Sequence, residues 1–223
     1  ENKSNFLFFL FITLSLFFII INEKLLTNVN IESNKVKYNN IKDEISEGDL
    51  ILCRSYHSFN IFELFIFRYL SCLLQNTFFG HIGIVVRDGD DTLKIIHSTY
   101  KEDESGVLIQ DLDEYIEKYY GNVYVYKNNL QNINPKILDF NENKEFFNIY
   151  KDHKYGLKEN EIACIGFIYE YMKYFDLFKN DPNKYLIGID YFIIRSNYKS
   201  GTEFSKPYLI LNNYQKKNTT TRI

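Results

Sequence analysis

The 223-residue chain has few cysteines and no excess of charge of one sign. Its three cysteines are Cys53, Cys72 and Cys164, an odd number without a C-x-x-C pair, which argues against a disulfide framework and against a zinc knuckle. The 26 basic residues are offset by 29 acidic ones, so the chain lacks the basic surface that neutralising phosphates requires. We therefore expect no nucleic-acid partner and at least one cysteine that is free for other chemistry.

One long apolar run lies near the beginning of the sequence. Residues 6–21, FLFFLFITLSLFFIII, carry no charge. The run is longer than a signal-peptide core of roughly 7–15 residues and shorter than a spanning helix of about 20. No small-x-small cleavage site follows Ile21, which favours a retained anchor over a cleaved signal. A buried core helix fits less well, because such helices are seldom apolar all round. We predict a membrane anchor or signal segment over residues 1–22.

The rest of the chain predicts a linker, one folded domain and a tail. We assign residues 23–46 to a polar linker, residues 47–212 to the domain and residues 213–223 to a flexible tail. Apolar patterns predict strands at 50–53, 81–86, 92–99, 107–110 and 122–126, and helices at 58–74, 142–150 and 161–178. Asp111 or Asp113 is placed to cap a short helix before the last of these strands. This mixture of elements indicates an α+β domain.

The hairpin expected from strands 81–86 and 92–99 brings two histidines together. Alternation places His81 and Gly83 on one face of their strand, and the missing side chain of Gly83 leaves room for another element, which we expect to be the helix that bears Cys164. If the Asp-Gly turn is centred on Gly89, His81 faces His97 directly, with Cβ atoms about 4.5–5.5 Å apart. A shift of one residue would put them on opposite faces. Each histidine taken alone also fits an ordinary structural role.

Cys164 is the cysteine with the most distinctive setting. With Asn160 as the cap, it falls in the first turn of the helix predicted over 161–178, where N–H groups and the helix dipole stabilise a thiolate. It also lies on an apolar stripe with Ile168, Tyr171 and Phe175, which is equally typical of a small buried hydrophobic residue. Both interpretations stay open from the helix alone. Cys53 and Cys72 fall within apolar elements, and we expect them to be core residues.

A cysteine at a helix start, a histidine on a strand and a third polar group form a known arrangement of nucleophile, base and orienting residue. The chain contains GDLIL at 48–52, GHIGIVV at 80–86, His97, SGVLIQDLDEYI at 105–116, VYVY at 123–126 and YGLKENEIACIGFIYEYM at 155–172. On these motifs, residues 48–194 resemble the circularly permuted papain-like group, which includes permuted NlpC-type amidases, YiiX-like proteins, lecithin:retinol acyltransferase relatives and a poxvirus branch.

The resemblance implies a fold, an activity and a site. The fold is a permuted papain-like (NlpC-type) α+β fold, with an antiparallel sheet packed against the nucleophile-bearing helix. Cys164 would be the nucleophile, His81 its general base and His97 the orienting residue, without a cofactor. Two departures from the family pattern concern the substrate class: Gly80 stands where a serine is frequent, and Ile165 and Gly166 follow the cysteine in place of a Ser-Glu pair.

Three functions remain open on the sequence. The leading hypothesis is a membrane-associated thiol hydrolase or acyltransferase that acts on an acyl lipid or a peptide through an acyl-enzyme. The rival is a non-catalytic anchored module that binds a lipid or protein, which a thiol beyond hydrogen-bond range of His81, in a site filled by side chains, would favour. The third is a metal site built from His81, His97 and Cys164, although no carboxylate or second cysteine lies nearby in the sequence.

Overall fold

The computed structural model describes residues 34–55, 79–100, 105–119, 121–182, 189–194 and 197–211. Four features predicted from the sequence lie outside these ranges: the apolar segment 6–21, the helix 58–74, Cys72 and the tail 213–223. Within the described ranges, no helix has the length and apolar content that a membrane crossing requires.

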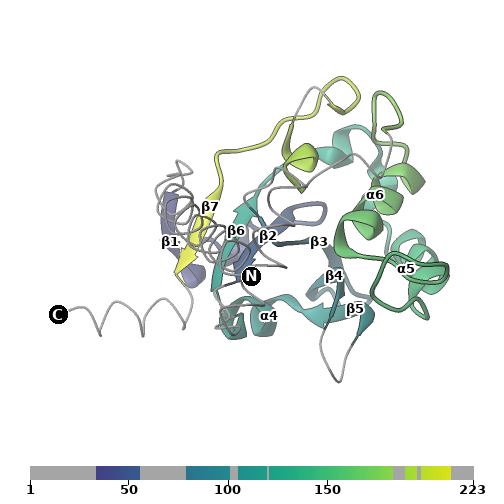
Figure 1. Ribbon diagram of the computed structural model, residues 1–223. Coiled ribbons are helices and arrows are strands. Elements are labelled where there is room, and N and C mark those ends of the chain that lie inside the picture. Colours follow the sequence, from purple (N-terminus) through teal and green to yellow (C-terminus); the bar gives the residue numbers. More distant parts are fainter. Residues whose placement is uncertain are drawn as a thin grey trace, which may run out of the picture.

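In the part of the chain that the structure describes, seven strands form one sheet in the order β1-β7-β6-β2-β3-β4-β5 (Figure 1). The strands are β1 (Asn34–Lys37), β2 (Leu50–Ser55), β3 (His81–Arg87), β4 (Leu93–Thr99), β5 (Gly106–Asp111), β6 (Gly121–Tyr126) and β7 (Tyr208–Leu211). Neighbouring strands are antiparallel except β1 and β7, which pair in parallel at one edge. With the helices described next, this sheet confirms the α+β class.

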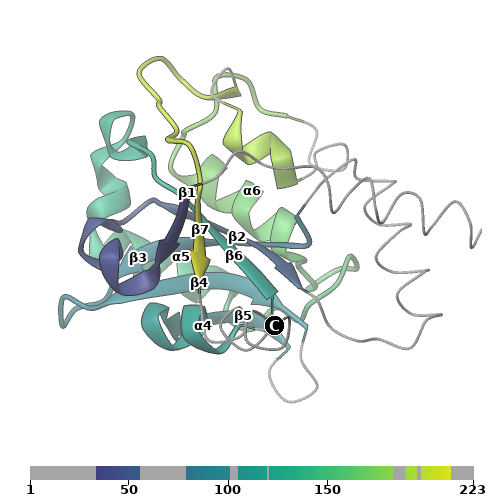
Figure 2. The ribbon, with the colours of Figure 1, turned by 90° about the vertical axis from the view of Figure 1, so that its left-hand side faces the viewer.

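Helices cover both faces of the sheet. Figure 2 shows α4 (Leu112–Lys118) below the strands and α6 (Cys164–Tyr174) above them. The side of α6, which also carries α5 (Phe140–Tyr150), is called the α6 face, and the other side is called the α4 face. Short 3-10 turns complete the described elements: η1 (Tyr38–Asn40), η2 (Lys42–Glu44), η4 (Leu130–Asn132), η5 (Pro135–Leu138) and η6 (Ile189–Ile193).

Side-chain alternation divides the core between the two faces. On β3, Ile82 and Ile84 belong to the cluster of the α6 face, whereas Val85 belongs to the cluster of the α4 face together with Ile95 of β4. The residues are buried on both sides, which explains why strand β3 is apolar almost throughout. The Asp111 side chain accepts a hydrogen bond from the Glu114 N–H at 3.0 Å and so caps α4, as one of the two predicted candidates.

Part of the predicted linker is structured. Residues 34–37 form β1, and Tyr38, Ile41 and Ile45 are buried in the cluster of the α4 face. The Tyr38 hydroxyl donates to the Asp113 carboxylate of α4 at 2.6 Å. The linker prediction was therefore wrong for residues 34–46, because three well-spaced apolar side chains anchor an otherwise polar stretch, and β7 supplies the backbone partners of β1.

The register of the β3–β4 hairpin differs from the prediction by two residues. The paired residues run from Arg87–Leu93 to Ile84–Ile96, so the turn is centred on Asp90 instead of Gly89. Asp91 adopts the left-handed conformation with φ 67°, which glycine adopts most easily and aspartate tolerates better than most other residues. Because the shift is an even number of residues, the faces on which the side chains lie are unchanged.

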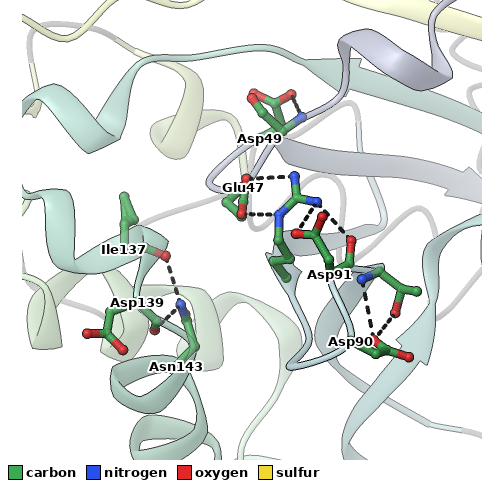
Figure 3. A network of polar contacts seen from close by, with 10 residues as sticks. Glu47, Asp49, Asp90, Asp91, Ile137, Asp139 and Asn143 are labelled. Atoms are coloured by element: carbon green, nitrogen blue, oxygen red, sulfur yellow. Dashed lines mark hydrogen bonds and ion pairs between the residues drawn. The ribbon is translucent and has the colours of Figure 1, made fainter.

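The turn end of this hairpin is held by a salt-bridge network and is called the closed end. The Arg87 guanidinium donates to Glu47 at 2.5 Å and 3.3 Å, and also to the Asp91 carboxylate at 3.0 Å. Figure 3 shows Glu47 and Asp91 on two sides of this guanidinium. The planar fork of arginine fits such two-sided pairing, so the network joins the start of β2 to the turn.

A buried carboxylate lies beside the closed end. Asp49, which is labelled in Figure 3, is fully buried. It accepts hydrogen bonds from the N–H groups of Ser46 and Asn128, each at 3.0 Å. Burial raises the pKa of Asp49 to about 6, although the two N–H donors pull it down. The residue directly before β2 is therefore a carboxylic acid that titrates above its usual range.

Helix α6 is shorter than predicted at both ends. It begins at Cys164 and not at residue 161, because Asn160 adopts φ 60° and the backbone of 154–162 is committed to a tight loop, with Ile162 N–H donating to Lys154 O at 2.7 Å. It ends at Tyr174, because Asp176 adopts φ 52° and the Leu177 N–H turns back to Met172 O. The predicted cap at Asn160 was wrong: the N-cap is Ala163, which makes no side-chain cap.

Candidate functional site

The two predicted histidines are in direct contact. His81 Nε2 and His97 Nδ1 are 2.8 Å apart, and the two rings meet edge to face with centroids 5.0 Å apart. The contact is diagonal across β3 and β4, since the register shift moves the two residues out of direct opposition. The predicted meeting of His81 and His97 is confirmed, whereas the predicted pairing between them was wrong.

Two residues that the sequence did not single out extend this contact. Gln110 of β5 lies with its Oε1 2.9 Å from His97 Nε2, and the Tyr115 ring of α4 packs against the His97 ring at 5.1 Å between centroids. His97 is 2% exposed, so its hydrogen bonds are shielded from water. The sequence signal for Gln110 was a polar side chain within an apolar strand, but only the β4–β5 register shows that it meets a histidine.

This polar chain lies on the α4 face. Tyr115 packs against the cluster of that face, and its hydroxyl is 3.4 Å from the Cys53 sulfur. Gly83 lies on the same face, where an added Cβ would be 2.6 Å from Ile95 Cδ1 and 3.2 Å from His97 Cβ. The space above Gly83 is therefore used by its own hairpin partner β4. The prediction that Gly83 makes room for the Cys164 helix was wrong.

Cys164 is the first residue of α6 and lies at the unpaired end of β3 and β4, which we call the open end. The Val85 N–H donates toward β2, to Asp49 O, so by alternation the N–H groups of Ile84 and Ile82 point toward β4. The β3–β4 pairing stops at Ile84, and the Ile82 N–H hydrogen-bonds the Cys164 thiol. The start of α6 therefore contacts the unpaired ends of β3 and β4, which we call the fork.

A second contact fixes the helix start against β4. The Ser98 hydroxyl, fully buried next to His97, donates to the Ile162 carbonyl oxygen at 2.5 Å. Ile162 precedes the N-cap Ala163 by one residue, so this bond holds the segment that leads into Cys164. Both strands of the fork thus hold the helix start, β3 through Ile82 and β4 through Ser98.

The thiol is buried and neutral. Cys164 is 4% exposed, and burial raises the pKa of its thiol above the usual value. The N–H groups of Ile82 and Ile165 and the Tyr155 hydroxyl lower it in part. The expected stabilisation of a thiolate at the helix start is present but is outweighed by burial. The predicted apolar stripe is confirmed, since Ile168 and Phe175 are buried with Cys164.

The imidazole of His81 is neutral as well. Burial, together with the charge that His97 would carry, holds the pKa of His81 well below its usual range. At neutral pH the site therefore contains a neutral thiol and a neutral imidazole, as a general base requires, and not a preformed thiolate-imidazolium pair.

Tyr155 is a further group that the sequence did not single out. The Cys164 sulfur raises the pKa of its hydroxyl, with burial as the second cause, so the hydroxyl and the thiol are close neighbours. Its ring also lies 6.1 Å from that of Tyr100, which is strongly exposed. The loop before α6 therefore connects the thiol to the surface of the molecule.

The structure does not join all three predicted residues by hydrogen bonds. In the described part of the chain, the His81 ring bonds to His97, and no hydrogen bond links it to the Cys164 thiol. The thiol belongs to the cluster of the α6 face, but it lies close enough to Cys53 and Tyr115 of the α4 face that a charge on it would raise their pKa values. Within the described ranges, no three histidine, cysteine or acidic side chains are grouped as metal ligands.

The other described cysteine has a different environment. Cys53 is fully buried in the middle of β2, and burial raises the pKa of its thiol to about 12. This agrees with its predicted place in the core.

Neither a protein-family model nor a curated protein sequence matches the chain.

Proposed function

We propose that the protein is a cysteine-dependent acyl hydrolase or acyltransferase. Cys164 is the nucleophile, His81 the general base and His97 the residue that orients His81. The observation that carries the proposal is the placement of a thiol at an uncapped helix start, in the fork of the two strands that bear the paired histidines. A permuted papain-like fold is part of this proposal.

The reaction proceeds in two half-reactions. His81 Nδ1 takes the thiol proton while Sγ attacks the carbonyl carbon of the substrate. The N–H groups at the start of α6 stabilise the resulting oxyanion, because α6 lacks a side-chain cap that would occupy them. The proton then passes from His81 to the leaving amine or alcohol, which departs and leaves a thioester on Cys164. Water or an acyl acceptor, deprotonated by His81, attacks the thioester and restores the thiol.

The separation between His81 and the thiol is compatible with this scheme. Hydrogen bonds between catalytic groups are often long before substrate binds and shorten in the complex. The Ile82 N–H holds the sulfur one residue away from His81 along the backbone. A rotation of the thiol about its Cα–Cβ bond changes its partner without moving the helix.

We place the substrate at a membrane. The uncharged segment 6–21 and the strongly apolar segment 58–74 favour an acyl lipid over a peptide, with the domain held at the bilayer surface or in the secretory pathway. Carbonate extraction of the full chain, compared with a variant that lacks residues 1–22, tests the anchor. Release of the full chain into the supernatant would contradict it.

Activity-based labelling tests the chemistry. The full chain in detergent is treated with a thiol-directed acyl probe, and the labelled peptide is identified. We expect labelling at Cys164 and its loss in Cys164→Ala, with turnover reduced on the order of 10⁴-fold or more. The matched control is Cys53→Ala, which removes the other described buried thiol and leaves labelling intact. Phosphatidylcholine vesicles and an N-acyl dipeptide amide, compared as substrates, separate ester from amide chemistry.

A non-catalytic binding module is the second candidate. The observation in its favour is the absence of a hydrogen bond between Cys164 and His81 in the described ranges, together with a thiol that is 4% exposed. On this alternative, Cys164→Ala binds lipid vesicles as wild type does, and the probe labels neither protein. Labelling that depends on Cys164 rejects it.

A further inference from the structure

A row of polar side chains crosses three strands on the α4 face. His81 on β3, His97 on β4 and Gln110 on β5 are joined by two hydrogen bonds, of 2.8 Å and 2.9 Å. The β4–β5 register pairs Ile95 with Gln110 and His97 with Leu108, which places Gln110 diagonally next to His97. The mechanism above uses the first two residues and assigns no role to the third.

The direction of these hydrogen bonds follows from counting donors. A neutral imidazole has one N–H donor and one acceptor nitrogen, and a carbonyl-type oxygen is an acceptor. Gln110 Oε1 faces His97 Nε2, so His97 donates through Nε2 and its Nδ1 is an acceptor. His81 Nε2 lies against that acceptor and must carry the proton. The lone pair of His81 is then on Nδ1, the nitrogen that points away from His97.

We propose that Gln110 is a positioning residue that fixes the tautomers of both histidines and thereby leaves His81 Nδ1 unprotonated as the base. If the hydrogen bonds of this row ran in the opposite direction, the proton of His81 would be on Nδ1. That nitrogen could then not accept a proton from the thiol. The inference rests on the proposed function for its catalytic meaning, whereas the tautomers themselves are a property of the fold.

Burial makes this control effective. His97 is almost fully buried and is covered by the Tyr115 ring, so water does not compete for its two nitrogens. A buried imidazole without an acceptor for its N–H would lose a hydrogen bond. The tautomer selected by Gln110 is therefore the one in which both contacts are made.

Nitrogen NMR of the histidine side chains tests the proposal directly. In the full chain labelled with ¹⁵N, we expect protonated Nε2 and unprotonated Nδ1 for both His81 and His97. Gln110→Leu removes the acceptor and should shift His97 toward a mixture of tautomers. Gln110→Glu keeps an acceptor at the same position and should preserve the wild-type pattern. Ile109→Ala, on the opposite face of β5, is the matched control and should change neither ring.

The outcomes separate this inference from the proposed function. A wild-type His81 protonated on Nδ1, or tautomers unchanged in Gln110→Leu, overturns the role of Gln110. If the tautomers are as expected, Gln110→Leu should also slow probe labelling of Cys164 by roughly tenfold, which is part of the 10²–10⁴-fold that a positioned base contributes. Gln110→Glu should keep the wild-type labelling rate. If the tautomers respond as expected but Cys164 is never labelled, the proposed function fails and the tautomer assignment stands.

Discussion

The two ends of the β3–β4 hairpin differ in the partners of their backbone hydrogen bonds. At the closed end, the strands are paired up to Arg87 and Leu93, and the Arg87 side chain ties the turn to Glu47. At the open end, pairing stops at Ile84 and Ile96, and the backbone N–H of Ile82 donates to the Cys164 thiol and not to β4. In one half of the hairpin the two strands are therefore paired with each other. In the other half, backbone and side-chain polar groups form hydrogen bonds with the start of α6.

This difference shows where the fold has room for chemistry. Regular pairing uses every inward N–H and carbonyl group of a strand, so nothing remains for a ligand or a nucleophile. A fork releases such groups while the rest of the hairpin keeps the strands in register. The paired histidines lie at the forked end, and the buried carboxyl Asp49 lies at the paired end. We expect substitutions at the open end to change reactivity and those at the closed end to change stability.

The largest effect is expected for His81→Ala. Loss of the general base should slow probe labelling of Cys164 by roughly 10²–10⁴-fold. The matched control is His153→Ala, which removes a histidine whose ring packs on Tyr150 and makes no contact with the His81 ring. Stopped-time labelling followed by mass spectrometry measures both rates. Equal rates for the two variants would remove His81 from the mechanism.

Much of the open end was predictable, because the alternation of β3 and β4 decides which residues share a face. His81 and His97 are both odd-numbered positions, so a register error of two residues left them together. Gln110 was not predictable, since its contact depends on the β4–β5 register, and the start of α6 was misplaced because Asn160 turns the backbone before the helix begins. Long-range pairing, such as that of β1 with β7, has no local sequence signal.

The next largest effect belongs to the closed end and depends on pH. The pKa of Asp49 is about 6 in the folded protein and near 4 in an unfolded chain, so the folded state binds its proton more tightly. Its stabilising contribution is complete below pH 4 and is lost as the pH rises through 6. The loss amounts to about 3 kcal/mol at most, from two pH units at about 1.4 kcal/mol each.

Urea unfolding between pH 4 and pH 7 measures this loss. Asp49→Asn cannot titrate at this position. The unfolding free energy of wild type minus that of the variant should therefore fall as the pH rises from 4 to 7. The titration of His81 is common to both proteins and cancels. Parallel curves for the two proteins would show that Asp49 does not titrate in this range.

A smaller effect is expected between the two ends, at Gly83. An added Cβ would overlap the side chain of Ile95 at 2.6 Å and crowd His97. Gly83→Ala should therefore lower the free energy of unfolding by about 1–3 kcal/mol and slow labelling of Cys164, because His97 must move. Gly80→Ala is the matched control, since among the described residues no atom apart from its chain neighbours lies within 4 Å of its added Cβ. Thermal unfolding and labelling of both variants check the prediction, and equal effects at the two glycines would contradict it.

The smallest effect is expected for Arg87→Lys at the closed end. Lysine keeps the charge but loses the planar fork that pairs with Glu47 and Asp91 at the same time. Because the Arg87 side chain is about a third exposed, 34%, the loss in unfolding free energy should be about 0.2–1 kcal/mol and should shrink at high salt. Urea unfolding at two salt concentrations measures it. Labelling of Cys164 should be unchanged, because the paired residues from 84 to 87 separate this network from the fork. A labelling rate that falls while stability stays constant would show instead that the closed end controls the geometry of the open one.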